Sequence, residues 1–167
     1  KNSGFEFPQS KITINLAPAD LKKEGSCFDL PVALGILAAR QIISSDVASR
    51  FHFIGELALD GSVKPVSGVL PMAMSVKQSG GKFVVPKANA IEASVVGIEA
   101  YGVESLKECV DFLTGKKEIL PYNVDWDNIL AMQNKYDIDF KEVKGQAVAR
   151  RAIEVAVAGA HNLLVIG

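Results

Sequence analysis

The segment from Asp29 to Arg40 restricts the possible folds of this chain most, because small and large apolar residues fill nearly every position. An amphipathic surface helix would keep one polar face, and this segment has none. We therefore expect a helix that is buried on several sides. Asp29, with Pro31 two residues later, is the expected N-terminal cap signal. A chain of 167 residues with 49% hydrophobic and 22% charged residues can bury the core that such a helix requires.

Other segments carry strand and turn signals. Lys11 to Leu16 alternates polar with β-branched or apolar residues, which predicts a half-buried strand. Asp60-Gly61 lies between the apolar runs of residues 51–66 and predicts a hairpin whose two central residues have positive φ. Further helices are expected at residues 68–79, 90–96 and 105–113, with strands at 82–85 and 99–103. Ser105 and Glu108 form a capping-box pattern.

The pattern of the sequence changes after residue 115. Gly115 to Tyr136 has no clear period and is interpreted as a linker, partly ordered by Trp126. Beyond it we expect a helix at Gln146–Ala160 and a buried strand at Leu163–Ile166, as at the entry to a parallel α/β domain. The predicted organisation is an α+β domain over residues 1–115, a linker over 116–137, and the start of a second domain over 138–167. Both ends look cut, so a fragment of a longer protein is expected.

The charge and the cysteine content exclude few classes of function. The net charge of −1 gives no bulk argument for or against nucleic acid. Cys27 and Cys109 lie far apart and in no metal-ligand spacing, so we expect reduced packing cysteines of a cytoplasmic protein and no metal site. No apolar run approaches the roughly 20 residues that span a bilayer.

Ser26 and Cys27 precede the apolar helix, where a helix N-terminus can activate a nucleophile. A nucleophile also needs a base, and the two histidines, His52 and His161, each lie in or beside an apolar strand. A Ser-Lys dyad is chemically possible. The alternative is an ordinary helix start without catalysis.

Three blocks resemble the proteolytic domain of Lon in order and spacing: "KKEGSCFDLPVALGILAA", "FIGELALDGSVKPVSGVLPMAMSVKQSG" and "KFVVPKANAIEAS". The second block matches Lon at Gly55, Glu56, Leu57, Leu59, Gly61, Val63, Pro65, Val66, Gly68 and Val69. The resemblance implies a Lon protease-like, ribosomal S5 domain 2-like fold. It also places the nucleophilic serine of Lon at Cys27 and the dyad lysine at Leu70. Because leucine cannot accept a proton, no catalytic residue is expected.

The C-terminal part, "DFKEVKGQAVARRAIEVAVAGAHNLLVIG", resembles the start of a P-loop AAA+ ATPase domain. The resemblance implies that the segment Val143, Lys144, Gly145, Gln146 lies beside the nucleotide base. Gly167 would be the first glycine of a Walker A loop whose remaining residues are absent. Such a loop binds phosphates through backbone N–H groups and a lysine, so no cofactor is expected in residues 1–167.

The order of these two modules resembles the magnesium-chelatase-like competence proteins of the ComM/YifB type. This implies an accessory Lon-like domain of a cytoplasmic, ring-forming, hexameric ATPase that uses ATP and Mg²⁺. It also implies DNA as a partner, branch migration during natural transformation, and no membrane association.

Several alternatives stay open. One is a Ser-Lys peptidase with a displaced dyad, Ser26 with Lys64. Another is a metal-chelatase ATPase subunit. Lys22, Lys23 and Glu24 are either a solvated turn or a DNA-contacting loop. Glu56 is either functional or a strand-edge residue, and Arg150-Arg151 is either a surface pair or an inter-subunit contact.

Overall fold

The computed structural model describes residues 3–6, 9, 11–17, 25–122 and 139–166. The chain divides into two compact units, residues 1–125 and 126–167, and each is described by itself. The first unit is mixed α/β, with a three-stranded parallel sheet and a separate two-stranded hairpin.

The parallel sheet is built from β1 (Phe51–Phe53), β4 (Lys82–Pro86) and β5 (Ala100–Val103), in the order β1-β4-β5. β4 is central and buried after Lys82, as expected for a continuous apolar run covered on both faces. Its register places Phe53 beside Val84, and Val84 beside Tyr101.

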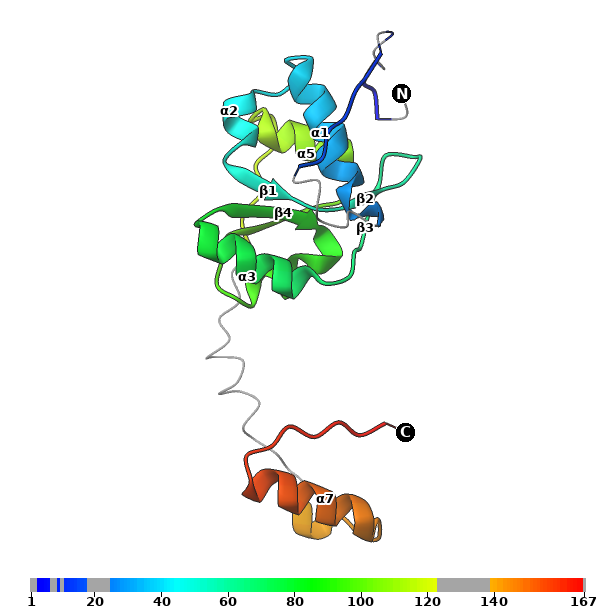
Figure 1. Ribbon diagram of the computed structural model, residues 1–167, viewed down its shortest axis with the longest axis vertical. Coiled ribbons are helices and arrows are strands. Elements are labelled where there is room, and N and C mark those ends of the chain that lie inside the picture. The colour runs from blue at the N-terminus through cyan, green and yellow to red at the C-terminus, as the bar shows by residue number, and fades with distance from the viewer. Residues whose placement is uncertain (1–2, 7–8, 10, 18–24, 123–138, 167) are drawn as a thin grey trace. The chain divides into compact units, whose positions relative to one another are not determined.

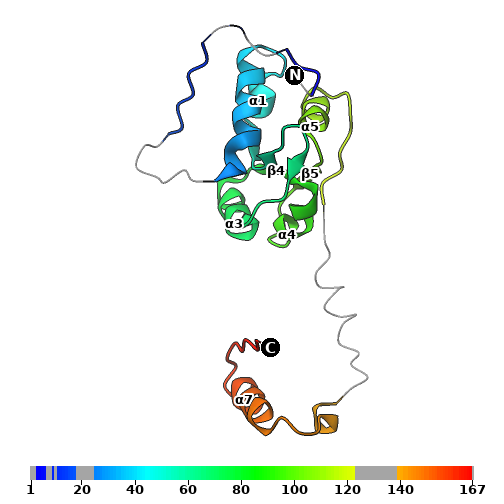
Figure 2. The same cartoon turned by 90° about the vertical axis from the view of Figure 1, so that its right-hand side faces the viewer.

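Helices cover both faces of this sheet, as Figures 1 and 2 show. On one face lie α1 (Asp29–Ala39) and α5 (Leu106–Leu113), whose apolar residues share a core with Val84. On the other face lie α3 (Val69–Ser79) and α4 (Ala90–Ser94), which pack against Phe83 and Val85. The remaining short elements are η1 (Ser26–Phe28), α2 (Ser45–Ala48) and η2 (Lys87–Asn89). Alternation of side chains along β4 therefore supplies two separate cores.

The expected hairpin exists, but with different arms. β2 (Glu56–Leu57) pairs antiparallel with β3 (Val63–Lys64), whereas the run at residues 51–53 pairs with β4 instead. Gly61 has φ +87°, but Asp60 does not have positive φ, so the prediction for Asp60 is wrong. The Asp60 carboxylate accepts hydrogen bonds from the N–H and hydroxyl of Ser62, which closes the turn by a side-chain route.

The burial predicted for α1 is also wrong. Its fully buried residues are Leu30, Leu34 and Leu37, while Gly35 and Ala39 are exposed. One stripe of the helix faces the sheet, and the opposite face borders a groove. Asp29 is the first helical residue and not the cap, and its carboxylate accepts instead from the Leu57 N–H, at 3.3 Å.

The helix predicted at residues 105–113 begins as its capping pattern indicated. The Ser105 hydroxyl accepts from the Glu108 N–H at 3.1 Å. The Glu108 carboxylate reaches back to the N–H of Glu104, one residue earlier than a standard capping box requires.

Two predicted strands are not strands in the structure. Residues 11–16 and 163–166 have no ladder partner among the described residues. Strand pairing needs a neighbour within hydrogen-bonding distance, which sequence alternation alone cannot supply. The second unit contains η3 (Phe140–Glu142) and α7 (Ala147–Ala158), which confirms the helix expected there. Trp126 and most of the predicted linker lie outside the described residues.

Candidate functional site

The start of α1 is held by the link between β1 and β2. Gly25, with φ +106°, leads into the 3₁₀ turn Ser26–Phe28, which continues directly into α1. The Gly55 N–H donates to the Cys27 carbonyl at 2.9 Å, and the Leu30 N–H donates to the Gly55 carbonyl at 3.0 Å. A helix N-terminus leaves backbone donors without intrahelical partners, and Gly55 accepts from one of them. Gly55 thus fixes the position of Cys27.

Ser26 is bound by a carboxylate. Its hydroxyl donates a hydrogen bond to Oε2 of Glu56, the first residue of β2. Glu56 in turn lies directly opposite Lys64 in the β2–β3 ladder. The structure therefore brings Ser26, Glu56 and Lys64 to one exposed edge. Among the described contacts no hydrogen bond joins Ser26 to Lys64, as a Ser-Lys dyad requires.

The link between Ser26 and Glu56 was not foreseen from the sequence. Glu56 was assigned either a functional or a strand-edge role, and nothing in the pattern paired it with a serine 30 residues earlier. Ser26 lies in the first Lon-like block and Glu56 in the second, and the spacing of the two blocks does not indicate this contact.

Leu70, for which the resemblance to Lon predicts the position of a lysine, is the second residue of α3 and 37% exposed. Its backbone N–H donates to Oε1 of Glu92 at 3.1 Å. The other carboxylate oxygen, Oε2, accepts from Nδ2 of Asn89 at 3.2 Å. The Glu92 carboxylate therefore lies at the N-terminal end of α3, where the helix dipole interacts favourably with a negative charge. The side chain at position 70 has no atom that can act as a base.

His52 does not complete a catalytic group at this site. Nε2 of His52, on β1, lies 3.2 Å from the hydroxyl of Ser79 at the end of α3. His161 belongs to the second unit, where it follows α7. Among the described residues of the first unit, His52 forms no hydrogen bond with Ser26 or Cys27.

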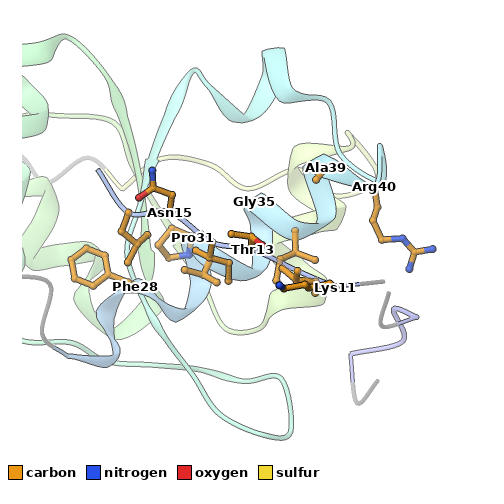
Figure 3. Close-up of a pocket in the computed structure, with 13 residues that line it drawn as sticks. Lys11, Thr13, Asn15, Phe28, Pro31, Gly35, Ala39 and Arg40 are labelled. Atoms are coloured by element: carbon orange, nitrogen blue, oxygen red, sulfur yellow. The ribbon is translucent and has the colours of Figure 1, made fainter. Parts of the chain in front are cut away.

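A groove of about 560 Å³ runs beside α1. One wall is the extended segment Lys11–Leu16, and the other is the outer face of α1 with Phe28. Figure 3 shows Lys11 near Ala39 and Arg40 at one end, and Asn15 near Phe28 and Pro31 at the other. Most lining residues are apolar, as in ordinary ligand and peptide grooves.

The predicted nucleotide-binding segment lies in the second unit. Gly145 and Gln146 both have positive φ, +76° and +48°, and immediately precede α7. The Arg150 guanidinium donates to the Val143 carbonyl at 3.1 Å and lies 5.5 Å from the Phe140 ring centre. Val143, Lys144, Gly145 and Gln146 are thus gathered at one helix start, and all four are exposed.

These residues alone do not form a complete nucleotide site. No lysine or hydroxyl residue of a phosphate loop accompanies them in residues 139–166, and Gly167 lies outside the described residues. Of the two arginines in α7, Arg151 forms a 3.4 Å ion pair with Glu154 on its own helix, which fits a solvated surface.

Among the described residues there is neither a metal-binding cluster nor a membrane-spanning helix. No group of three or more His, Cys, Asp or Glu side chains is arranged to hold a metal ion. No described helix combines the length and apolar character needed to cross a bilayer.

Comparison with known proteins identifies the family. Residues 1–89 match the family model described as subunit ChlI of Mg-chelatase, and residues 139–167 match the model of magnesium chelatase, subunit ChlI. The chain is 39% identical to the competence protein ComM of Haemophilus influenzae over 99% of its own length. It is also 39% identical to YifB of Escherichia coli over 99% of its length. The chain spans about one third of both relatives, 33% and 32% respectively.

The resemblance to Lon is also found, at lower coverage. Lon protease 2 of Bacillus subtilis is 34% identical over 66% of the chain, which spans 20% of that protein. The match to the ChlI model covers more than half of the chain, and ComM and YifB are among the relatives similar over nearly all of it. The chain therefore belongs to the family of magnesium-chelatase ChlI-like proteins, of the ComM and YifB type.

Proposed function

We propose that residues 1–115 form a Lon-like domain without proteolytic activity, and that it is an accessory domain of an AAA+ ATPase related to magnesium chelatase. In this proposal residues 116–137 are a linker and residues 138–167 begin the ATPase domain. The observation that supports it best is the geometry around Leu70. The side chain where Lon has its lysine is a hydrocarbon, and its backbone serves only as a partner of Glu92.

The hydrogen bond of Ser26 supports the same conclusion. A hydroxyl that donates to a carboxylate is oriented by it, and the described contacts of the first unit include no hydrogen bond from Ser26 to a lysine or histidine. Cys27, in the nucleophile's position, has its carbonyl bound to Gly55 and no recorded side-chain base among the described residues. The scaffold of the site is kept while its proton acceptor is missing.

The absence of peptidase activity is testable on the present chain. We expect no turnover of fluorogenic peptides or of unfolded casein by the wild type, and the same background from Ser26→Ala and Cys27→Ala. Turnover that Ser26→Ala and Lys64→Ala both abolish would establish the displaced Ser-Lys peptidase instead.

We further propose that the whole protein is a cytoplasmic, ring-forming, ATP-driven motor acting on DNA. The name of ComM as a competence protein supports the DNA partner, and the match of residues 139–167 to a magnesium chelatase model supports ATP and Mg²⁺ as cofactors. Val143, Lys144, Gly145 and Gln146 would lie at the nucleotide, whose Mg²⁺-bound phosphates supply the chemistry of hydrolysis. Gly167 would begin the phosphate loop.

The full-length protein tests this proposal. We expect Mg²⁺-dependent ATP hydrolysis that rises on addition of single-stranded or forked DNA, and sedimentation as a hexamer when nucleotide is bound. ATPase activity that is indifferent to DNA but stimulated by a porphyrin would favour the chelatase alternative, in which the motor inserts a metal ion.

A further inference from the structure

The outer surfaces of α3 and α4 carry apolar side chains that the core does not use. Helix α3 buries a separate stripe against the sheet, which consists of Val69, Ala73 and Val76. Leu70 and Met74, four residues apart on its outer side, are 37% and 53% exposed. Ile91 and Val95 repeat this spacing at α4, with 54% and 41% exposed. These four residues are called the α3–α4 patch, and such a group of exposed apolar side chains indicates a contact surface.

Helices α3 and α4 lie side by side and run in the same direction. At their starts, the Leu70 N–H donates to Oε1 of Glu92 at 3.1 Å. At their ends, Nζ of Lys77 donates to the Val96 carbonyl at 2.6 Å. Figure 2 shows the two helices next to each other on one face of the sheet. The exposed apolar residues of α3 therefore border those of α4.

The α3–α4 patch has opposite charges at its two ends. The Glu92 carboxylate lies at the start of the helix pair, and the Lys77 ammonium lies at its end, in the last turn of α3. Both residues are exposed, and neither forms an ion pair with another described residue. A surface with apolar side chains and opposite charges at opposite ends is complementary to a copy of itself turned by 180°.

We propose that the α3–α4 patch is an isologous contact between two copies of this chain. A two-fold axis through its centre lays each helix pair against its equivalent in the opposite direction, which brings Glu92 of each copy to Lys77 of the other. Between these two ion pairs the apolar side chains of both copies pack together and leave water. The patch is small compared with a standard interface, so the dimer is weak and reversible. The contact goes beyond the function proposed above, because a ring interface joins two different surfaces.

Sedimentation velocity of the 167-residue chain over a wide range of protein concentration tests the proposal. We expect a reversible equilibrium between monomer and dimer. Met74→Ser should weaken dimerisation by about tenfold, because it removes apolar surface from both halves of the contact. Leu120→Ser, at an exposed apolar position outside α3 and α4, is the matched control and should leave it unchanged. A chain that stays monomeric at every concentration, or a dimer that both substitutions affect equally, would overturn the proposal.

Charge reversal tests the two-fold arrangement. Lys77→Glu alone and Glu92→Lys alone should each weaken dimerisation by about tenfold, because each places like charges at both contacts. An equimolar mixture of the two variants should regain the association of the wild type, since both contacts then join opposite charges.

Circular dichroism checks that both charge variants are folded, and Met74→Ser still decides the proposal if Glu92→Lys does not fold. A mixture that associates no more strongly than either variant alone would overturn the two-fold contact. These measurements do not depend on ATP, DNA or peptidase activity, so their outcome is independent of the function proposed above.

Discussion

The side-chain amide of Asn89 pairs with both backbone groups of Val66. Oδ1 of Asn89 accepts from the Val66 N–H, and Nδ2 of Asn89 donates to the Val66 carbonyl, each at 3.0 Å. The amide thus takes the place of a neighbouring strand for a residue that has none. Because Nδ2 also donates to Glu92, which accepts from the Leu70 N–H, this pair fixes the entry to α3.

Asn89→Ala should therefore destabilise the protein by about 1–3 kcal/mol, since Asn89 is 7% exposed and its loss leaves two backbone groups of Val66 without partners. Urea denaturation followed by circular dichroism measures the change. Ile91→Ala, at a half-exposed position two residues later, is the matched control and should cost less than about 0.5 kcal/mol. Equal effects of the two substitutions would show that the amide contributes nothing particular.

Two glycines should respond to alanine in opposite directions. A Cβ at Gly55 would lie 2.8 Å from Cγ1 of Val63 and 3.1 Å from Cδ2 of Leu30, so Gly55→Ala should destabilise by about 1–3 kcal/mol. Gly35 lies within α1 with open space around it, so Gly35→Ala should stabilise by about 0.5–1 kcal/mol. Thermal unfolding of both variants provides the comparison, and a loss of stability in Gly35→Ala would contradict the open groove.

Acid should weaken the fold partly through Glu108. Burial alone would raise the pKa of this carboxyl, but hydrogen bonds from the Lys117 ammonium and the Glu104 N–H outweigh it and lower the pKa below 4.5. A carboxyl with a lowered folded-state pKa contributes stability above its unfolded pKa, and that contribution is lost as pH falls through the folded value. We therefore expect stability to fall as pH drops below about 4.5.

Glu108→Gln isolates this contribution. Its free energy of unfolding should be lower than that of the wild type near neutral pH and should converge with it in acid, as measured by urea titrations across the range. Parallel curves for the two proteins at every pH would refute the role of Glu108. Lys117→Met removes the principal partner and should flatten the pH dependence in the same way.

The two thiols should differ sharply in reactivity. Burial raises the pKa of the Cys109 thiol to about 12, so almost no thiolate exists near neutral pH, whereas Cys27 is partly exposed. A thiol reagent such as DTNB should modify one cysteine of the native protein readily and the second only on unfolding. In Cys27→Ser the native protein should show no fast reaction, and a fast phase in that variant would place Cys109 at the surface.

Local signals determined much of this protein from sequence. The Asp60-Gly61 turn, the Ser105 cap and the strand expected at residues 82–85 each depend on residues a few positions apart, so the sequence contains the whole local signal. The sequence also showed that the side chain at position 70 cannot act as a base, because this depends only on which residue is present there. The ChlI family and the ComM and YifB type followed from the motifs and their order.

Tertiary structure decided the relationships between distant segments. The run at Phe51–Phe53 became a parallel partner of β4 and not a hairpin arm, and Ser26 was brought to Glu56. Which side of α1 is buried was likewise decided by its neighbours in the fold. An apolar pattern shows that a helix favours apolar contacts, but not which elements provide them. Such contacts close long loops, and their free energy depends on the partners that the whole fold places nearby.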